Sequence, residues 1–146
     1  GKWTTYRHMA EDAVNQAARF EPANKDYGTS IAIGETTYDE AKGAIEARLL
    51  DKIVVRGKTQ PVRLYELLAK KGELAPARLK IVRFYEEGLR LHWERKWKEA
   101  IACLDAALGL DSQDSPSIRL RERILAYMEV APPDTWTGEY TRAAKD

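Results

Sequence analysis

Residues 12–35 read DAVNQAARFEPANKDYGTSIAIGE, and this stretch predicts how the first half of the chain is built. The pattern predicts a helix over 12–20, which ends ahead of Pro22 because a proline disfavours helix at the residue before it. The polar, glycine-containing run over 23–29 has the composition of a turn. The short apolar run over 30–34 predicts a strand that is buried on both faces.

The predicted first helix carries a pair of residues suited to binding a nucleotide. Asn15 and Arg19 are four positions apart, so they lie on one face of the helix, one turn from each other. An amide and a guanidinium suit a sugar hydroxyl and a phosphate, because the guanidinium fork matches phosphate oxygens in pairs. The ordinary alternative is that both residues belong to the solvated side of an amphipathic helix.

The residues that follow predict a second helix and a β-hairpin. Residues 35–43 predict a short helix that a glycine ends. Residues 45–56 and 62–68 are rich in strand formers, and residues 57–61 between them contain a glycine and a proline, as turns do. Helices and strands in this order predict an α+β fold.

The second half of the chain predicts helices only. A polar linker over 71–77 precedes a helical extension over 78–130, in which apolar residues recur with helical spacing in three segments. The second of these helices is expected to end near Gly109, and Pro116 suits the first turn of the third.

Part of this extension resembles a known repeat. Gly88, Ala100 and Ala107 stand at small-residue positions and Leu104 at a large apolar one, and with this spacing residues 84–117 resemble one tetratricopeptide repeat. A single repeat cannot bury its own apolar faces, so it is expected to pack on its neighbours.

The tail over 131–146 contains two prolines, Trp136, Gly138 and Tyr140, and we expect it to fold back as a clip over apolar surface. The basic residues Arg78, Lys80, Arg83 and Arg90 are predicted to form a solvated helix face. Trp93 and Trp97 are predicted to pack rather than to stack on nucleic acid.

Composition narrows the classes of function. The chain has 146 residues, 44% of them hydrophobic and 32% charged, with a net charge of +1, which favours a soluble domain without a general affinity for nucleic acid or membrane. No apolar run approaches the length of a membrane helix. The single Cys103, expected to be buried filler, fits a reducing, cytoplasmic location. Two histidines and one cysteine cannot form a zinc-type cluster, so no metal ligands are assigned.

Several short sequence motifs occur together in one known family. VNQAARFE, NKDYGT, ETTY and VVRGKTQPVRLYEL follow one another in order. They resemble the C-terminal part of the catalytic domain of bacterial class III adenylate and guanylate cyclases, over residues 12–70. Residues 1–11 form a lead-in without period, and the His-Met pair within it is typical of a cloning junction.

The resemblance implies a partial cyclase-type, ferredoxin-like unit and assigns roles to four residues. Asn15 matches the residue that orients the ribose, and Arg19 the one that stabilises the phosphorus in the transition state. Arg56 matches a residue that contacts the nucleotide phosphates, and Lys58 ranks second for that role. The family converts ATP to cyclic AMP and pyrophosphate at sites between two catalytic domains, so a homodimer is expected.

The resemblance also implies that essential parts lie upstream. The family binds Mg²⁺ or Mn²⁺ through aspartates of the first half of its domain, which would precede Gly1. We therefore expect this chain to be inactive alone. The position that reads the purine falls on His8 or Arg7, and neither matches, so ATP and GTP both stay open. The alternative is a non-catalytic cyclase-like module whose extension mediates protein interaction or dimerisation.

Overall fold

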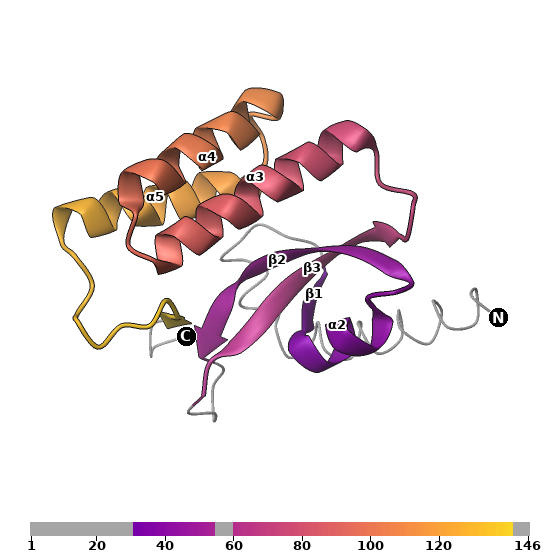
Figure 1. Ribbon diagram of the computed structural model, residues 1–146, viewed down its shortest axis with the longest axis horizontal. Coiled ribbons are helices and arrows are strands. Elements are labelled where there is room, and N and C mark those ends of the chain that lie inside the picture. Colours follow the sequence, from indigo (N-terminus) through magenta and orange to yellow (C-terminus); the bar gives the residue numbers. More distant parts are fainter. Residues whose placement is uncertain (1–30, 55–59, 142–146) are drawn as a thin grey trace.

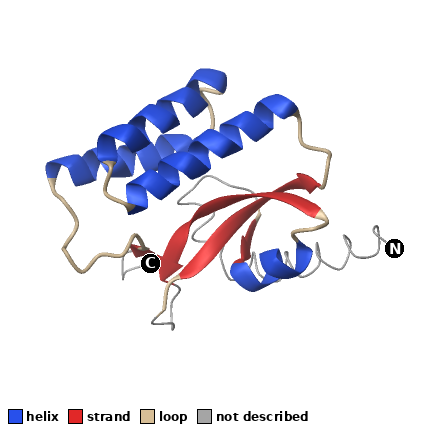
Figure 2. Ribbon diagram, in the orientation of Figure 1, coloured by secondary structure: helices blue, strands red, loops and turns tan. Residues whose placement is uncertain are grey.

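The computed structural model describes residues 31–54 and 60–141. These residues form a small, mainly antiparallel sheet and four helices, so the predicted α+β class is confirmed (Figure 1). Three of the helices lie together on one side of the sheet, and the remaining short helix lies on the other side (Figure 2).

The sheet has the strand order β1-β3-β2-β4. Its centre is the hairpin of β2 (Ile45–Val54) and β3 (Val62–Lys70), which pair antiparallel with two shifts of register. The three-residue β1 (Ala32–Gly34) pairs antiparallel with β3, and all three residues are buried, as the sequence predicted for this strand. The two-residue β4 (Tyr140–Thr141) pairs parallel with the end of β2.

Helix α2 (Glu35–Ala41) follows β1 directly and closes a small core on one face of the sheet. This core contains Ile33, Ala41, Ile45 and Tyr65. The rings of Tyr38 and Tyr65 stack at 3.8 Å between centroids. Burial raises the pKa of both phenols, so both remain protonated at neutral pH.

The other three helices share a core of their own. Helix α3 (Pro76–Trp93) begins at Pro76, two residues earlier than expected, because a proline in the first turn gives up no hydrogen bond. It is followed by α4 (Trp97–Leu110) and α5 (Ser115–Glu129), close to the predicted bounds. The three helices contribute the following buried residues to this core: Tyr85, Leu89, Ala100, Leu104, Leu120 and Ile124. No helix among the described residues is long and apolar enough to span a membrane.

Helix α3 lies against the backbone of β2. The backbone N–H of Leu49 donates to Glu86 Oε2 at 2.9 Å, and the hydroxyl of Tyr85 donates to the carbonyl of Leu50 at 2.6 Å. Leu50 has no partner in β3, because the pairing of the two strands shifts register between Leu49 and Asp51. Side chains of α3 thus satisfy main-chain groups of β2 at this register shift.

Candidate functional site

The four residues to which the sequence assigns a site lie outside the described residues. These are Asn15, Arg19, Arg56 and Lys58. The structure describes the framework next to the last two of them, since β2 ends at Val54 and β3 begins at Val62. Two groups of buried charges and a cluster of aromatic rings lie between the sheet and the three helices.

The first group of charges is centred on Arg48, which is fully buried. Strand pairing places Arg48 opposite Glu66, and the Arg48 Nε donates to Glu66 Oε1 at 3.1 Å. The other two guanidinium nitrogens donate to the two carboxylate oxygens of Asp114, at 2.8 and 2.9 Å. Such a paired contact between a guanidinium and a carboxylate is the strongest form of charged hydrogen bond. One side chain of β2 therefore binds both its neighbouring strand and the start of α5.

Asp114 is held from several sides. It precedes the first turn of α5, and it accepts hydrogen bonds from the hydroxyl of Ser117 at 2.6 Å and from Arg78 at 3.2 Å. Burial would raise the pKa of Asp114, but the hydrogen bonds from Arg48 and Ser117 outweigh it and lower the pKa. For Glu66 the balance is reversed, and burial raises its pKa despite Arg48. The surroundings thus favour the ionised form of Asp114 more than that of Glu66.

The second group of charges lies further along β2, at Asp51. This carboxylate is fully buried and accepts hydrogen bonds from Trp93 Nε1 of α3 at 3.2 Å and from Arg123 of α5. The neighbouring Lys52 places its ammonium 4.4 Å from the Trp93 ring centroid and donates to the carbonyl of Thr137 at 2.8 Å. Consecutive residues of one strand thus bind two helices and the tail.

A cluster of aromatic rings surrounds His92, at the end of α3. His92 is fully buried, and its ring lies 5.6 Å from Trp97, 5.8 Å from Tyr127 and 5.3 Å from Trp136. Its Nε2 is 3.2 Å from a guanidinium nitrogen of Arg123. Because a guanidinium can only donate, Nε2 accepts and the proton of the neutral ring is on Nδ1.

This histidine is kept neutral by its surroundings. Burial, together with the nearby charge of Arg123, lowers the pKa of His92 from 6.5 to about 3. Nδ1 has no hydrogen-bond partner within the described part of the chain. A donor that is buried without a partner carries a cost, so His92 is a position where the fold tolerates an unfavourable group.

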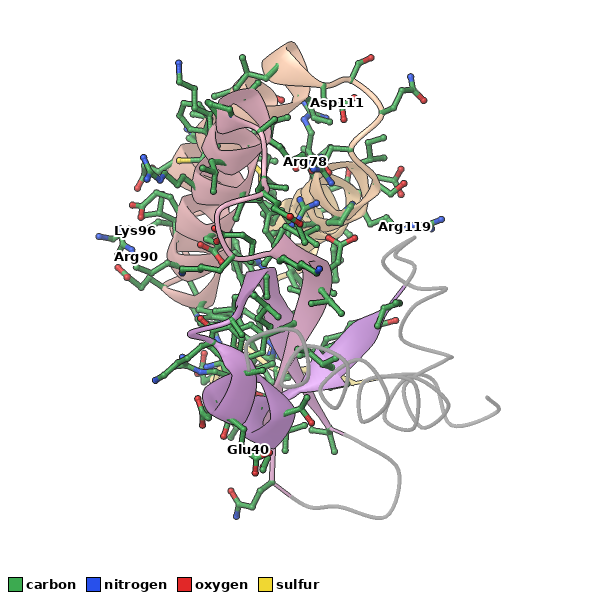
Figure 3. The ribbon with its side chains drawn as sticks, turned by 90° about the vertical axis from the view of Figure 1, so that its right-hand side faces the viewer. Glu40, Arg78, Arg90, Lys96, Asp111 and Arg119 are labelled. Carbon is green, nitrogen blue, oxygen red and sulfur yellow. The ribbon has the colours of Figure 1, made fainter. Side chains whose placement is uncertain are left out.

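The exposed charges of the helices differ from these buried groups (Figure 3). Lys80, Arg83 and Arg90 are exposed, as predicted for a solvated helix face. Arg78 was expected to belong to that face, but it is only 30% exposed and pairs with Asp111 and Asp114. Figure 3 shows Arg78 and Asp111 close together and Arg119 directed away from the helices.

The buried charges of the described residues attach the sheet to the helices. Nearly all of the buried charges are saturated by one another. No group of three or more histidine, cysteine, aspartate or glutamate residues that could hold a metal ion occurs in residues 31–54 and 60–141. Cys103 was expected to be buried, but it is only partly so, and burial raises the pKa of its thiol. Its nucleophilic form is therefore disfavoured.

Sequence reasoning did not single out the buried charges. Arg48, Asp51 and Lys52 interrupt a run of strand formers, and this interruption was the available signal. Charged residues in an otherwise apolar strand are seldom buried without partners. Their partners Asp114 and Arg123 are 66 and 72 positions away, where no local pattern connects them.

Comparison with known proteins gives one relationship. The chain is 27% identical over 118 residues to an adenylate cyclase of Dictyostelium discoideum, described as terminal-differentiation specific. The match includes 78% of this chain and 6% of that protein, so the chain spans a small fraction of its relative. No protein-family model matches the chain, and no solved structure matches it.

The match is long enough to include part of the helical extension. Residues 1–70 are less than half of the chain, so an alignment over 78% of it necessarily includes part of the helical extension. The similarity to an adenylate cyclase is therefore not confined to residues 12–70, which contain the cyclase-like motifs. The sheet and at least part of the helices are related to the same protein.

Proposed function

We propose that this chain is the C-terminal part of a nucleotide cyclase catalytic domain together with a helical, tetratricopeptide-like extension. The observation that carries the proposal is the 118-residue similarity to an adenylate cyclase. The cyclase-like motifs of the sequence agree with it, because they fall in the order in which the family has them.

The proposed reaction is the conversion of ATP to cyclic AMP and pyrophosphate. The 3′-hydroxyl attacks the α-phosphorus in line, the bond to pyrophosphate breaks, and the hydroxyl proton is lost. Arg19 would stabilise the charge that develops on the phosphorus, and Asn15 would orient the ribose. Arg56 and Lys58 would bind the phosphates. Mg²⁺ or Mn²⁺, held by residues upstream of this chain, would activate the hydroxyl and neutralise the leaving group.

The structure supports this proposal through its framework. The hairpin strands β2 and β3, which precede and follow Arg56 and Lys58 in the sequence, are attached to the helices by the buried pairs of Arg48 with Asp114 and Asp51 with Arg123. A site that works by positioning needs such a rigid support. We propose that the active species is a cytoplasmic homodimer in which two cyclase domains form the sites between them.

A second candidate is a non-catalytic module that binds a partner or sets a dimer. The observation in its favour is the set of large apolar side chains that remain exposed in and just after α5, namely Leu125, Met128 and Val130. Clustered apolar residues on a helical surface are typical of interaction sites.

One experiment separates the two candidates. Formation of cyclic AMP and cyclic GMP would be measured with Mg²⁺ and with Mn²⁺, for this chain and for a longer chain that includes its native upstream sequence. We expect activity in the longer chain and none in this one. A folded longer chain that makes neither product would exclude the cyclase and favour the module.

A further inference from the structure

The tail of the chain is bound by side chains as a peptide ligand would be. We call residues 132–141 the strap. The guanidinium of Arg95 donates to the carbonyl of Pro132 at 3.2 Å and to that of Pro133 at 2.5 Å. The same guanidinium lies 5.3 Å from the ring centroid of Trp136. One side chain of the helical unit thus recognises two backbone carbonyls and an aromatic ring of the strap.

The centre of the strap is its tryptophan. Trp136 lies against the rings of His92, Trp97 and Tyr127, at 5.3, 6.0 and 5.5 Å between centroids. Its Nε1 donates to the carbonyl of Glu139 within the strap, at 2.8 Å. The polar atom of the indole is therefore satisfied by the strap itself, and the helices supply only an aromatic surface.

The far end of the strap lies on β2 and needs a glycine. Gly138 has a φ of 103°, and a Cβ placed there would stand 2.8 Å from Cδ1 of Trp93. The strap then pairs with Ile53 through Tyr140, and the guanidinium of Arg123 lies 4.8 Å from the Tyr140 ring centroid. Besides this bridge of two residues, the hydrogen bond from Lys52 Nζ to the carbonyl of Thr137 joins the strap to β2.

Arg95 itself occupies a backbone conformation that disfavours it. Its φ is 63°, in the left-handed region, directly after the C-cap of α3. Glycine is the usual residue at such a position, since a Cβ is unfavourable there. An arginine at this place makes the end of α3 less stable than a glycine would. The side chain of this arginine, however, contacts the strap through its guanidinium.

We propose that the surface formed by Arg95, Trp97, Tyr127 and Trp93 is a peptide-binding site, and that the strap is a detachable ligand that occupies it in cis. The site fits an extended segment with two prolines followed by a tryptophan and a glycine. The strap leaves it while the helices stay folded, because it is joined through exposed residues, Val130 being 78% exposed. Its release opens the edge of β2 at Ile53 and Val54. This inference does not depend on the cyclase activity.

Hydrogen exchange of the whole chain tests whether the strap detaches. Amides of residues 136–141 are expected to exchange at least about 10-fold faster than buried amides of α4, since local opening precedes global unfolding. Arg95→Gly is expected to increase the exchange rate of the strap amides about 10-fold further. The α4 amides should exchange as slowly as before or more slowly, because glycine suits the left-handed backbone at the end of α3. Arg119→Ala, on an exposed part of α5, is the control and should change neither rate. Equal exchange of strap and α4 in both proteins would overturn the proposal.

Titration with a peptide tests whether the surface beneath the strap is a peptide-binding site. A fluorescent peptide of residues 131–141 would be titrated with the chain carrying Trp136→Ala, which weakens the competing strap. We expect this variant to bind the peptide at least about 10-fold more tightly than the unchanged chain does. When Arg95→Ala is combined with Trp136→Ala, the increase in peptide affinity should be lost. Absence of binding would contradict the proposal. So would loss of helical circular dichroism in Trp136→Ala, because the helices must remain folded without the strap.

Discussion

Arg48 of β2 and Asp114 at the start of α5 are 66 positions apart and form two parallel hydrogen bonds, of 2.8 and 2.9 Å, between buried side chains. Together with the pair of Asp51 and Arg123, this contact joins the sheet to the helical extension. Removing either half of the molecule would take away the partners of these charges and expose the residues around them to solvent. We infer that the extension is required for the sheet to fold, and is not an independent repeat appended to it.

Substitution of Asp114 tests this inference. Asp114→Ala leaves Arg48 buried with only Glu66 as a partner, and breaking a buried ion pair costs about 3–5 kcal/mol. We expect the free energy of unfolding, measured by urea denaturation, to fall by that amount. The matched control is Asp105→Ala, which removes a surface ion pair with Arg121 worth about 0–1 kcal/mol. Similar losses in the two variants would show that the buried pair is not essential.

The stability of the protein is expected to depend on His92 at mildly acidic pH. The pKa of His92 falls from 6.5 to about 3 on folding, so His92 is neutral in both the folded and the unfolded state above the unfolded value. The free energy of unfolding decreases as the pH falls below about 6.5, because the unfolded state then binds a proton that the folded state does not. At pH 5 the loss is about 2 kcal/mol for an isolated group with these two pKa values.

The corresponding measurement is thermal unfolding of the chain and of His92→Gln between pH 7 and pH 5. Glu66 and Glu86 also have raised pKa values, caused first by burial, so the difference between the two proteins is the quantity to follow. We expect the variant to lose less stability on acidification than the unchanged chain. Substitution of the second histidine, His8→Gln, is the control. Parallel pH profiles for the chain and His92→Gln would contradict the assigned pKa.

Two glycines of the helical unit should respond to alanine in opposite ways. A Cβ at Gly88 would lie 3.1 Å from Cδ2 of Leu104, so Gly88→Ala overpacks the contact of α3 with α4 and should cost about 1–3 kcal/mol. A Cβ at Gly109 meets nothing within 4 Å, and Gly109→Ala should stabilise α4 by up to about 1 kcal/mol. Chemical denaturation of both variants checks this. Destabilisation by Gly109→Ala, or none by Gly88→Ala, would be the contrary result.

The sequence predicted the elements of the described part well, because their periods are local. The helices begin and end within a few residues of the expected positions, and Trp93 and Trp97 pack as predicted. The tail folds back over the helices as expected of a proline- and tryptophan-containing end. These features follow from short-range patterns and from the need to bury large apolar side chains.

The contacts between the halves could not be predicted in the same way. The charges of β2 have no neighbours in sequence to indicate their partners, and Arg78 looked like one more member of a solvated face. The left-handed backbone of Arg95 also gave no signal, since glycine would be expected there. The roles of Asn15, Arg19, Arg56 and Lys58 stay predictions, as these residues lie outside the described ranges.

The most direct test of the proposed function is the kinetics of Arg19→Ala in the longer chain that includes the native upstream sequence. If Arg19 stabilises the transition state, kcat for cyclic AMP formation should fall by roughly 100-fold or more, with a much smaller change in KM, by analogy with the loss of an oxyanion-hole donor. Arg119→Ala, whose side chain is exposed on α5, should leave both parameters unchanged. A decrease of only a few-fold for Arg19→Ala in a folded, active protein would contradict the role assigned to Arg19.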